Sequence, residues 1–277
     1  MENPKNNSCS ASVLILTPLM DAAMYLKGYF RTLSQLSYPK ELISLGFLVS
    51  TVTKDSQQDP TLQTLRSHIS SLPIRPSYKR ITIIHQASEA TDFKHDERHA
   101  FEYQKARRKE LARCRNILLT SALMDEAWVL WLDVDVIHYS PSLLLELMQL
   151  DKDIVVPNCF RFEPAWPKAR RVPYDRNNWY ETTESMAHQR TLDPSYEQYH
   201  PTFRQSMTDL DLYTPRLVPL DGVGGTFTLV KAAVHRSGVI FPIEPVDHEI
   251  ETEGMAKWAK RLGFSVFGIP HLSVLHA

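Results

Sequence analysis

Short apolar runs alternate with segments of helical spacing along the first half of this chain. The apolar runs predict strands at 13–16, 45–52, 80–85, 128–135 and 154–157. The intervening segments have apolar residues every three or four positions and predict helices at 26–36, 61–72 and 100–123. Strands that alternate with helices imply a mostly parallel sheet with helices on both faces. The sequence therefore predicts an α/β fold.

The alternation is interrupted between residues 161 and 219, a segment rich in Pro, Tyr, Arg and Asp. Aromatic residues in and beside this segment favour an ordered, irregular insertion over disorder; they are Phe160, Phe162, Trp166, Tyr174, Trp179 and Tyr180. Regular structure is predicted to resume with a strand at 226–230, a helix at 249–262 and a strand at 265–267. We expect a polar N-terminal tail at 1–12 and a single domain at 13–277.

Composition excludes some classes of protein. Hydrophobic residues make up 43% of 277 positions, which suits a globular fold, and a net charge of −1 argues against nucleic acid as a partner. Three widely spaced cysteines predict no disulfide framework and no cysteine metal site, and Cys114 and Cys159 are predicted to be small core residues. No signal peptide and no membrane-spanning run is expected.

Two carboxylates, Asp133 and Asp135, stand at the end of the predicted strand 128–135. Residues i and i+2 of a strand face the same side, so the two acids should be presented together. Such a pair suits a hard divalent cation that also holds phosphate oxygens. The Asp-x-Asp pattern is a signature of nucleotide-sugar glycosyltransferases, but a buried strand can also end in acids on an ordinary polar loop.

Two arginines, Arg108 and Arg115, fall on the apolar stripe of the predicted helix 100–123. A buried guanidinium needs an anionic partner, because burying an unpaired charge is costly. That partner is either an acid elsewhere in the core, or the diphosphate of a nucleotide or an acid that lines its site. Asn116 follows and could bond a ribose or sugar hydroxyl.

Two polar segments near the C-terminal end suggest binding functions. In 221–225, three glycines allow either a tight turn or the close approach of backbone to a ligand, and Asp221 could receive a sugar hydroxyl. In 248–254, Glu251 and Glu253 either complement a helix dipole or face an acceptor. His271 and His276 follow the last predicted strand, and His276 becomes a candidate ligand if the chain end folds back to Asp135.

Several motifs occur in a specific order along the chain. They are Leu16-Thr17-Pro18-Leu19, Ala22-Ala23, Tyr29-Phe30, Arg107-Arg108, Arg115-Asn116, Trp131-Leu132-Asp133-Val134-Asp135, Tyr174-Asp175-Arg176-Asn177-Asn178-Trp179, Asp221 to Gly225 and His248 to Gly254. Over about residues 13–276, this set resembles the fungal mannan polymerase mannosyltransferases, glycosyltransferase family 62 of the Anp/Van/Mnn type.

The resemblance implies a GT-A fold with a mostly parallel, Rossmann-like sheet. It implies retaining α-mannosyl transfer from GDP-mannose, with Mn²⁺, to a mannan or N-glycan outer-chain acceptor. It also implies homologous mannosyltransferase subunits as partners, and the Golgi lumen as the location. Family members carry an N-terminal membrane anchor, and none is recognised in this sequence.

The resemblance also assigns site residues. Asp135 and His276 would ligate the metal, and Asp133 would support the metal or donor site. By resemblance, the nucleotide-sugar site would further include Thr17, Pro18, Leu19, Arg115 and Asn116. The residue patterns described above add Arg108 and Gly224 to this site, and they make Asp221, Glu251 and Glu253 the catalytic candidates.

Two other functions stay open, and the first would use the same acids. A metal-dependent hydrolase of nucleotide sugars would need a base that activates water and no acceptor groove, whereas the aromatic insertion favours a groove. A non-catalytic partner subunit would not need the intact acid pair, Asp133 and Asp135.

Overall fold

The computed structural model describes residues 11–51, 60–72, 77–87, 101–193, 203–210 and 216–277, without the side chains of residues 101–105. The predicted tail therefore lies almost entirely outside the described residues. Within them, no helix is long and apolar enough to cross a membrane.

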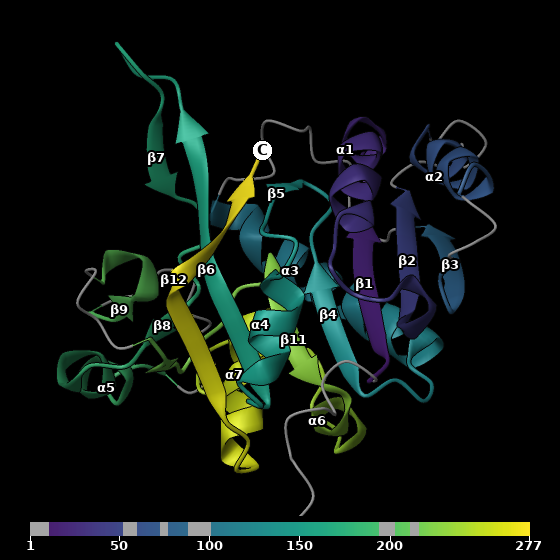
Figure 1. The fold of residues 1–277 in the computed structure, drawn as a ribbon. Coiled ribbons are helices and arrows are strands. Elements are labelled where there is room, and N and C mark those ends of the chain that lie inside the picture. The colour runs from purple at the N-terminus through teal and green to yellow at the C-terminus, as the bar shows by residue number, and fades with distance from the viewer. Residues whose placement is uncertain (1–10, 52–59, 73–76, 88–100, 194–202, 211–215) are drawn as a thin grey trace, which may run out of the picture.

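A large mixed sheet forms the centre of the fold (Figure 1). Its strand order is β10-β12-β6-β11-β4-β1-β2-β3, with β5 added to β12 and β7 added to β6. The strands are β1 (Val13–Leu19), β2 (Ile43–Thr51), β3 (Arg80–Ala87), β4 (Trp128–Leu132), β5 (Val136–His138), β6 (Ile154–Glu163), β7 (Arg170–Pro173), β10 (Val218–Pro219), β11 (Phe227–Lys231) and β12 (Val266–His276). β1 pairs in parallel with β2 and β4, whereas β11 runs antiparallel between β4 and β6. As a result, β4, β6 and β12 all end at the same edge of the sheet.

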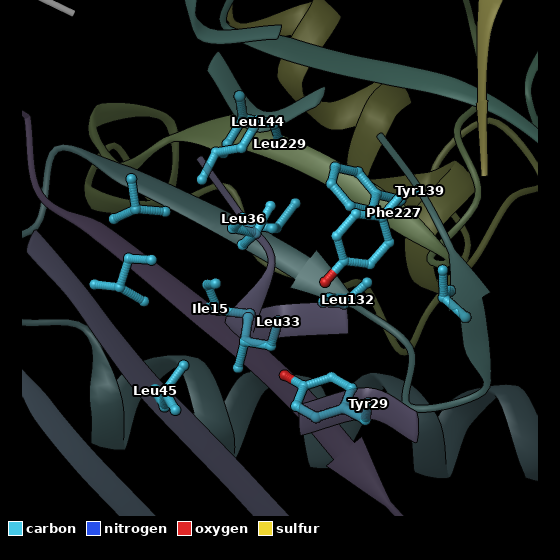
Figure 2. Close-up of a cluster of buried hydrophobic side chains, with 14 of the residues drawn as sticks. Ile15, Tyr29, Leu33, Leu36, Leu45, Leu132, Tyr139, Leu144, Phe227 and Leu229 are labelled. Atoms are coloured by element: carbon cyan, nitrogen blue, oxygen red, sulfur yellow. The ribbon is translucent and has the colours of Figure 1, made fainter. Parts of the chain in front are cut away.

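Helices cover both faces of the sheet, as predicted. One face carries α1 (Ala23–Ser34), α2 (Pro60–Ser70) and α4 (Leu143–Gln149), and the other carries α3 (Phe101–Ala122), α6 (Ala232–Arg236) and α7 (Glu251–Arg261). Successive residues of β1 enter opposite cores: Val13 and Ile15 face the first group of helices, and Leu14 and Leu16 face the second. Figure 2 shows the first core, where Ile15 lies close to Leu33 of α1.

The insertion contains short regular elements that the sequence did not predict. They are α5 (Thr183–Gln189), a 3₁₀ turn (Met207–Asp209) and a small sheet of β8 (Trp179–Tyr180) and β9 (Gln205–Ser206). Another 3₁₀ turn, Lys40–Leu42, precedes β2. β5 and α4 were also not predicted, and β6 continues well beyond residue 157. The β6–β7 hairpin projects beyond the edge where the other strands end (Figure 1).

Candidate active site

The carboxylate pair lies at the edge of the sheet where β4 ends. The predicted strand through residue 135 is wrong, because β4 stops at Leu132 and the amide of Val136 closes a turn on the carbonyl of Asp133 at 3.3 Å. Asp133 and Asp135 therefore lie in this turn, between β4 and β5. The two acids do stand together at the strand end, but a turn, not the alternation of a strand, places them there.

The last strand is much longer than predicted, and it carries His276 to the acid pair. In the antiparallel pairing of β12 with β5, His276 lies opposite Val136. Its Nε2 is 3.0 Å from Oδ2 of Asp135, and its ring stacks on Tyr174 with 3.7 Å between centroids. Its Nδ1 lies 3.0 Å from the carbonyl oxygen of Ala277. The chain end thus folds back to Asp135, which is the condition under which His276 becomes a candidate ligand.

The surroundings of Asp133 hold its pKa far above the usual carboxylate value. Burial raises this pKa, the guanidinium of Arg115 opposes the shift, and the charges of Asp135 and Asp175 add to it, giving about 7. The side chain nevertheless keeps 32% of its exposure, so a cation can reach it. Burial lowers the pKa of His276, but the hydrogen bond and charge of Asp135 outweigh it, and the net shift is upward. A divalent cation would relieve the repulsion among these carboxylates.

Two arginines of α3 point inward, as the helical stripe predicts, and the structure shows that both meet acids of α7. Arg115 is buried, forms an ion pair with Glu251, and has Nη2 3.6 Å from Oδ1 of Asp133. Nη1 of Arg108 lies 2.7 Å from Oε2 of Glu253. Both arginines therefore find the acids that burial requires. One of the two acids beside Arg115, Asp133, is also a candidate for the metal site.

Glu251 and Glu253 are both first-turn acids of α7 and buried ion-pair partners. Oε1 of Glu253 also accepts a hydrogen bond of 2.6 Å from the indole of Trp179. Glu251 has φ of 57°, a left-handed conformation that is uncommon for a residue with a side chain and often marks functional sites. Because their carboxylates point inward at arginines, contact with an acceptor stays a prediction for both.

Asp175 belongs to this cluster although the sequence pattern gives it no role. It is buried, with Oδ2 accepting from the hydroxyl of Thr226 at 2.8 Å and Oδ1 accepting from the amide of Asn177 at 3.0 Å. Burial raises its pKa in spite of these hydrogen bonds. In the sequence, Asp175 stands out only as an acid within a stretch rich in aromatic and amide residues. Its closeness to Asp133 could only come from the tertiary structure.

The glycines of the 222–225 loop make room for protein side chains. An added methyl group would overlap with Trp179 at Gly222, with Asp175 at Gly224 and with Arg115 at Gly225. Close packing of the site's own residues is therefore a reason for these glycines that the sequence did not predict, and close approach of a ligand stays a prediction. The assignment of Gly224 to the donor site stays a prediction.

Two side chains expected to bond sugar or ribose hydroxyls are engaged within the protein. The Asn116 amide donates to the carbonyl of Phe241 at 2.8 Å and accepts from its N–H at 2.9 Å. Asp221 forms an ion pair with Lys260 and accepts from the amide of Glu181 at 2.8 Å. Asn116 thus fixes the segment before α7, and Asp221 ties the insertion to that helix.

The predicted guanine-nucleotide segment lies at the end of β1, beside β4. The hydroxyl of Thr17 is buried, 2.8 Å from the Tyr29 hydroxyl, and it donates to the carbonyl of Leu132 at 2.8 Å. Leu19 is also buried, whereas Pro18 is partly exposed. Contact with a nucleotide can therefore fall on Pro18, while Thr17 holds β1 against the strand that carries the acids.

The chemistry of the predicted metal ligands fits a divalent cation. Two carboxylates and an imidazole are suitable donors for Mn²⁺, and a ligating histidine usually donates its other ring N–H to a carbonyl or carboxylate. Nδ1 of His276 has such a partner in the carbonyl of Ala277. Among the described residues, however, no three His, Cys, Asp or Glu side chains already form a metal site, and Asp135 and His276 bond each other. Metal binding would require this bond to open.

Comparison with solved structures shows the fold, which is that of the GT-A glycosyltransferases. A mannosyltransferase from Pyrobaculum calidifontis, solved with GDP-Man and Mn²⁺, matches with a TM-score of 0.56 and 12% identity, over 96% of this chain and 57% of that one. The S. aureus protein TarS 1–349, solved with UDP, matches with a TM-score of 0.50 and 12% identity, over 95% and 60%.

The chain belongs to the Anp1 family, whose model matches residues 1–245. It is 39% identical to the mannan polymerase complex subunit mnn9 of Schizosaccharomyces pombe, over 95% of this chain and 79% of that protein. It is 37% identical to the mannan polymerase II complex anp1 subunit of the same yeast, over 95% and 63%. Against the mannan polymerase I complex VAN1 subunit of Saccharomyces cerevisiae, it is 32% identical over 95% and 60%. The resemblance to mannan polymerase subunits is thereby confirmed.

Proposed function

We propose that this chain is a retaining α-mannosyltransferase that transfers mannose from GDP-mannose to a mannan or N-glycan acceptor, with Mn²⁺ as cofactor. The observation that carries the proposal is the gathering of Asp133, Asp135 and His276 where β4 and β12 end. Family membership supports it, because related chains are named mannan polymerase complex subunits. The Pyrobaculum mannosyltransferase shares the fold and was solved with GDP-Man and Mn²⁺.

In this proposal, Asp135 and His276 hold the metal, and Asp133 supports it. The bound cation would offset the charge that develops on the leaving diphosphate. Arg115 fixes the orientation of Asp133 through their 3.6 Å contact and keeps its carboxylate more acidic than burial alone would allow. Pro18, at the end of β1, would contact the nucleotide.

Retention requires the acceptor hydroxyl to attack from the side on which GDP leaves. The bond from the anomeric carbon to phosphate breaks as the bond to the acceptor oxygen forms. A phosphate oxygen of the departing GDP takes the hydroxyl proton, so this scheme needs no carboxylate nucleophile from the protein.

One incubation separates the three candidate functions. The chain is mixed with GDP-mannose, Mn²⁺ and mannobiose, and products are resolved by chromatography, with Asp135→Ala as the control. A trisaccharide that wild type makes and the variant does not supports transfer, and its new anomeric proton signal tests α retention. Free mannose without a trisaccharide indicates hydrolysis. No product at all, with GDP binding intact, indicates a non-catalytic subunit.

We further propose that the chain works beside homologous subunits in the Golgi lumen. The partner proposal is supported by its relatives, which are named as subunits of mannan polymerase complexes. The location follows only from the family resemblance. Co-purification with a tagged family member, and microscopy of the tagged chain beside a Golgi marker, would test the two points separately.

A further inference from the structure

A cavity of about 420 Å³ lies near the acid cluster, beside the projecting hairpin. It is lined by residues of β5, the start of α4, the β6–β7 hairpin and β12: His138, Ser140, Leu143, Phe162, Arg171, His271, Leu272, Ser273 and Leu275. Its volume is in the range typical of small-molecule sites. None of the residues discussed as metal or donor ligands lines it.

The lining combines exposed aromatic surface with hydrogen-bond donors. Phe162 is 54% exposed, and His138, Ser140 and His271 have polar side chains at the surface. None of the nine lining residues is acidic. An aromatic face beside neutral and basic donors suits the apolar face and the hydroxyl groups of a sugar, and it offers no carboxylate to a metal ion.

Arg171 is held in a fixed position within this lining. Its guanidinium stacks over the ring of Phe160 at 3.8 Å and donates to Oγ of Ser273 at 2.6 Å. Among the described residues, no carboxylate forms an ion pair with it. A guanidinium has five N–H donors, so most of them stay available to a ligand after the bond to Ser273. Such a preorganised donor loses little entropy when a ligand binds.

The cavity lies near the proposed metal site, because the paired strands β5 and β12 contribute residues to both. β5 begins directly after Asp135, and its His138 lines the cavity. On β12, Leu275 lines the cavity and the next residue is His276. Leu275 and His276 are neighbours in a strand and so point to different sides, and a chain-like ligand that spans both sites would pass the end of the β5–β12 pair.

We propose that this cavity binds the acceptor manno-oligosaccharide, at sugars that precede the one receiving the new mannose. The inference rests on the proposed mannosyl transfer and adds where the acceptor lies. Phe162 would stack on a sugar ring, and Arg171 and His138 would donate to hydroxyls. An acceptor longer than mannobiose would then bind more tightly, because only a longer chain can occupy the cavity and the acid cluster at the same time.

The test measures binding and transfer separately on the full chain. Mannobiose and mannopentaose are titrated by calorimetry into wild type, Phe162→Ala and Arg171→Ala. Arg170→Ala is the matched control, because Arg170 adjoins Arg171, is 72% exposed at its side chain, does not line the cavity, and pairs with Glu163 at 3.6 Å. We expect mannopentaose affinity to fall about tenfold in the two cavity variants, with GDP affinity and the KM for GDP-mannose unchanged.

The outcomes distinguish this inference from the proposed function. Equal mannopentaose affinity in wild type and both cavity variants overturns the acceptor site, even if wild type transfers mannose. Loss of mannopentaose binding in the cavity variants supports the site, even if wild type alone proves inactive. Unchanged saccharide binding, with loss of a co-purifying family subunit, would make this surface a protein interface and would also overturn the proposal.

Discussion

Replacing Arg115 by alanine would test the link between the core and the acid cluster. The side chain is 6% exposed and pairs with Glu251, whose side chain is 10% exposed. Removing one partner of a buried pair leaves an uncompensated charge, which costs about 3–5 kcal/mol of unfolding free energy. The pKa of Asp133, about 7 with Arg115 present, should also rise, because that guanidinium lowers it. At pH 7, less Asp133 would then be ionised, and Mn²⁺-dependent GDP binding should weaken.

Two measurements and two further variants make the Arg115 prediction specific. Urea unfolding gives the stability change, and calorimetry at pH 7 and pH 8.5 gives GDP affinity with Mn²⁺. Arg113→Ala is the matched control. Arg113 is 49% exposed and, within the described part of the chain, its ion pair is with Glu110 at 3.5 Å. An ion pair with a solvent-exposed arginine is usually worth less than a buried one. Arg115→Lys keeps the charge, so it should fold even if Arg115→Ala does not, and should recover part of the affinity. Equal, small effects at positions 113 and 115 would refute the reasoning.

Three further outcomes are expected. Asp135→Ala should abolish the Mn²⁺-dependent part of GDP binding measured by calorimetry, and unchanged affinity would remove Asp135 from the metal site. His235 is buried with its pKa lowered from 6.5 to about 4, mainly by burial, so the unfolded chain takes up its proton first as pH falls. The free energy of unfolding of wild type, relative to that of His235→Gln, should therefore fall by about 3 kcal/mol between pH 7 and pH 4. Urea unfolding that gives the same difference at both pH values would contradict this. Gly224→Ala should lower the melting temperature and weaken GDP binding, because the added methyl would displace the carboxylate of Asp175. An unchanged melting temperature and GDP affinity would show that the loop can shift to make room for the methyl.

Much of the fold followed from local sequence patterns. Alternation of apolar runs with helical spacing gave most of the larger strands and helices, because each needs a continuous apolar stripe to enter a core. The stripe on α3 correctly placed Arg115 among buried residues such as Leu118 and Leu119. The insertion was harder, because two-residue strands such as β8 and β9 are too short to show a period.

The sequence by itself determined which chemical groups the site contains: the acid pair after β4, the arginines of α3, the glycine loop and the terminal histidine. Only the tertiary structure decided which of them meet. Arg115 and Glu251 are 136 residues apart, and Asp175 reaches Thr226 across 51. Such contacts depend on strand order and on how helices and strands pack, and local periodicity carries no information about either. The contact of His276 with Asp135 likewise depends on β12 pairing with β5. For the same reason the glycines of the 222–225 loop, recognisable as unusual in the sequence, could be explained only when the side chains packed against them were known.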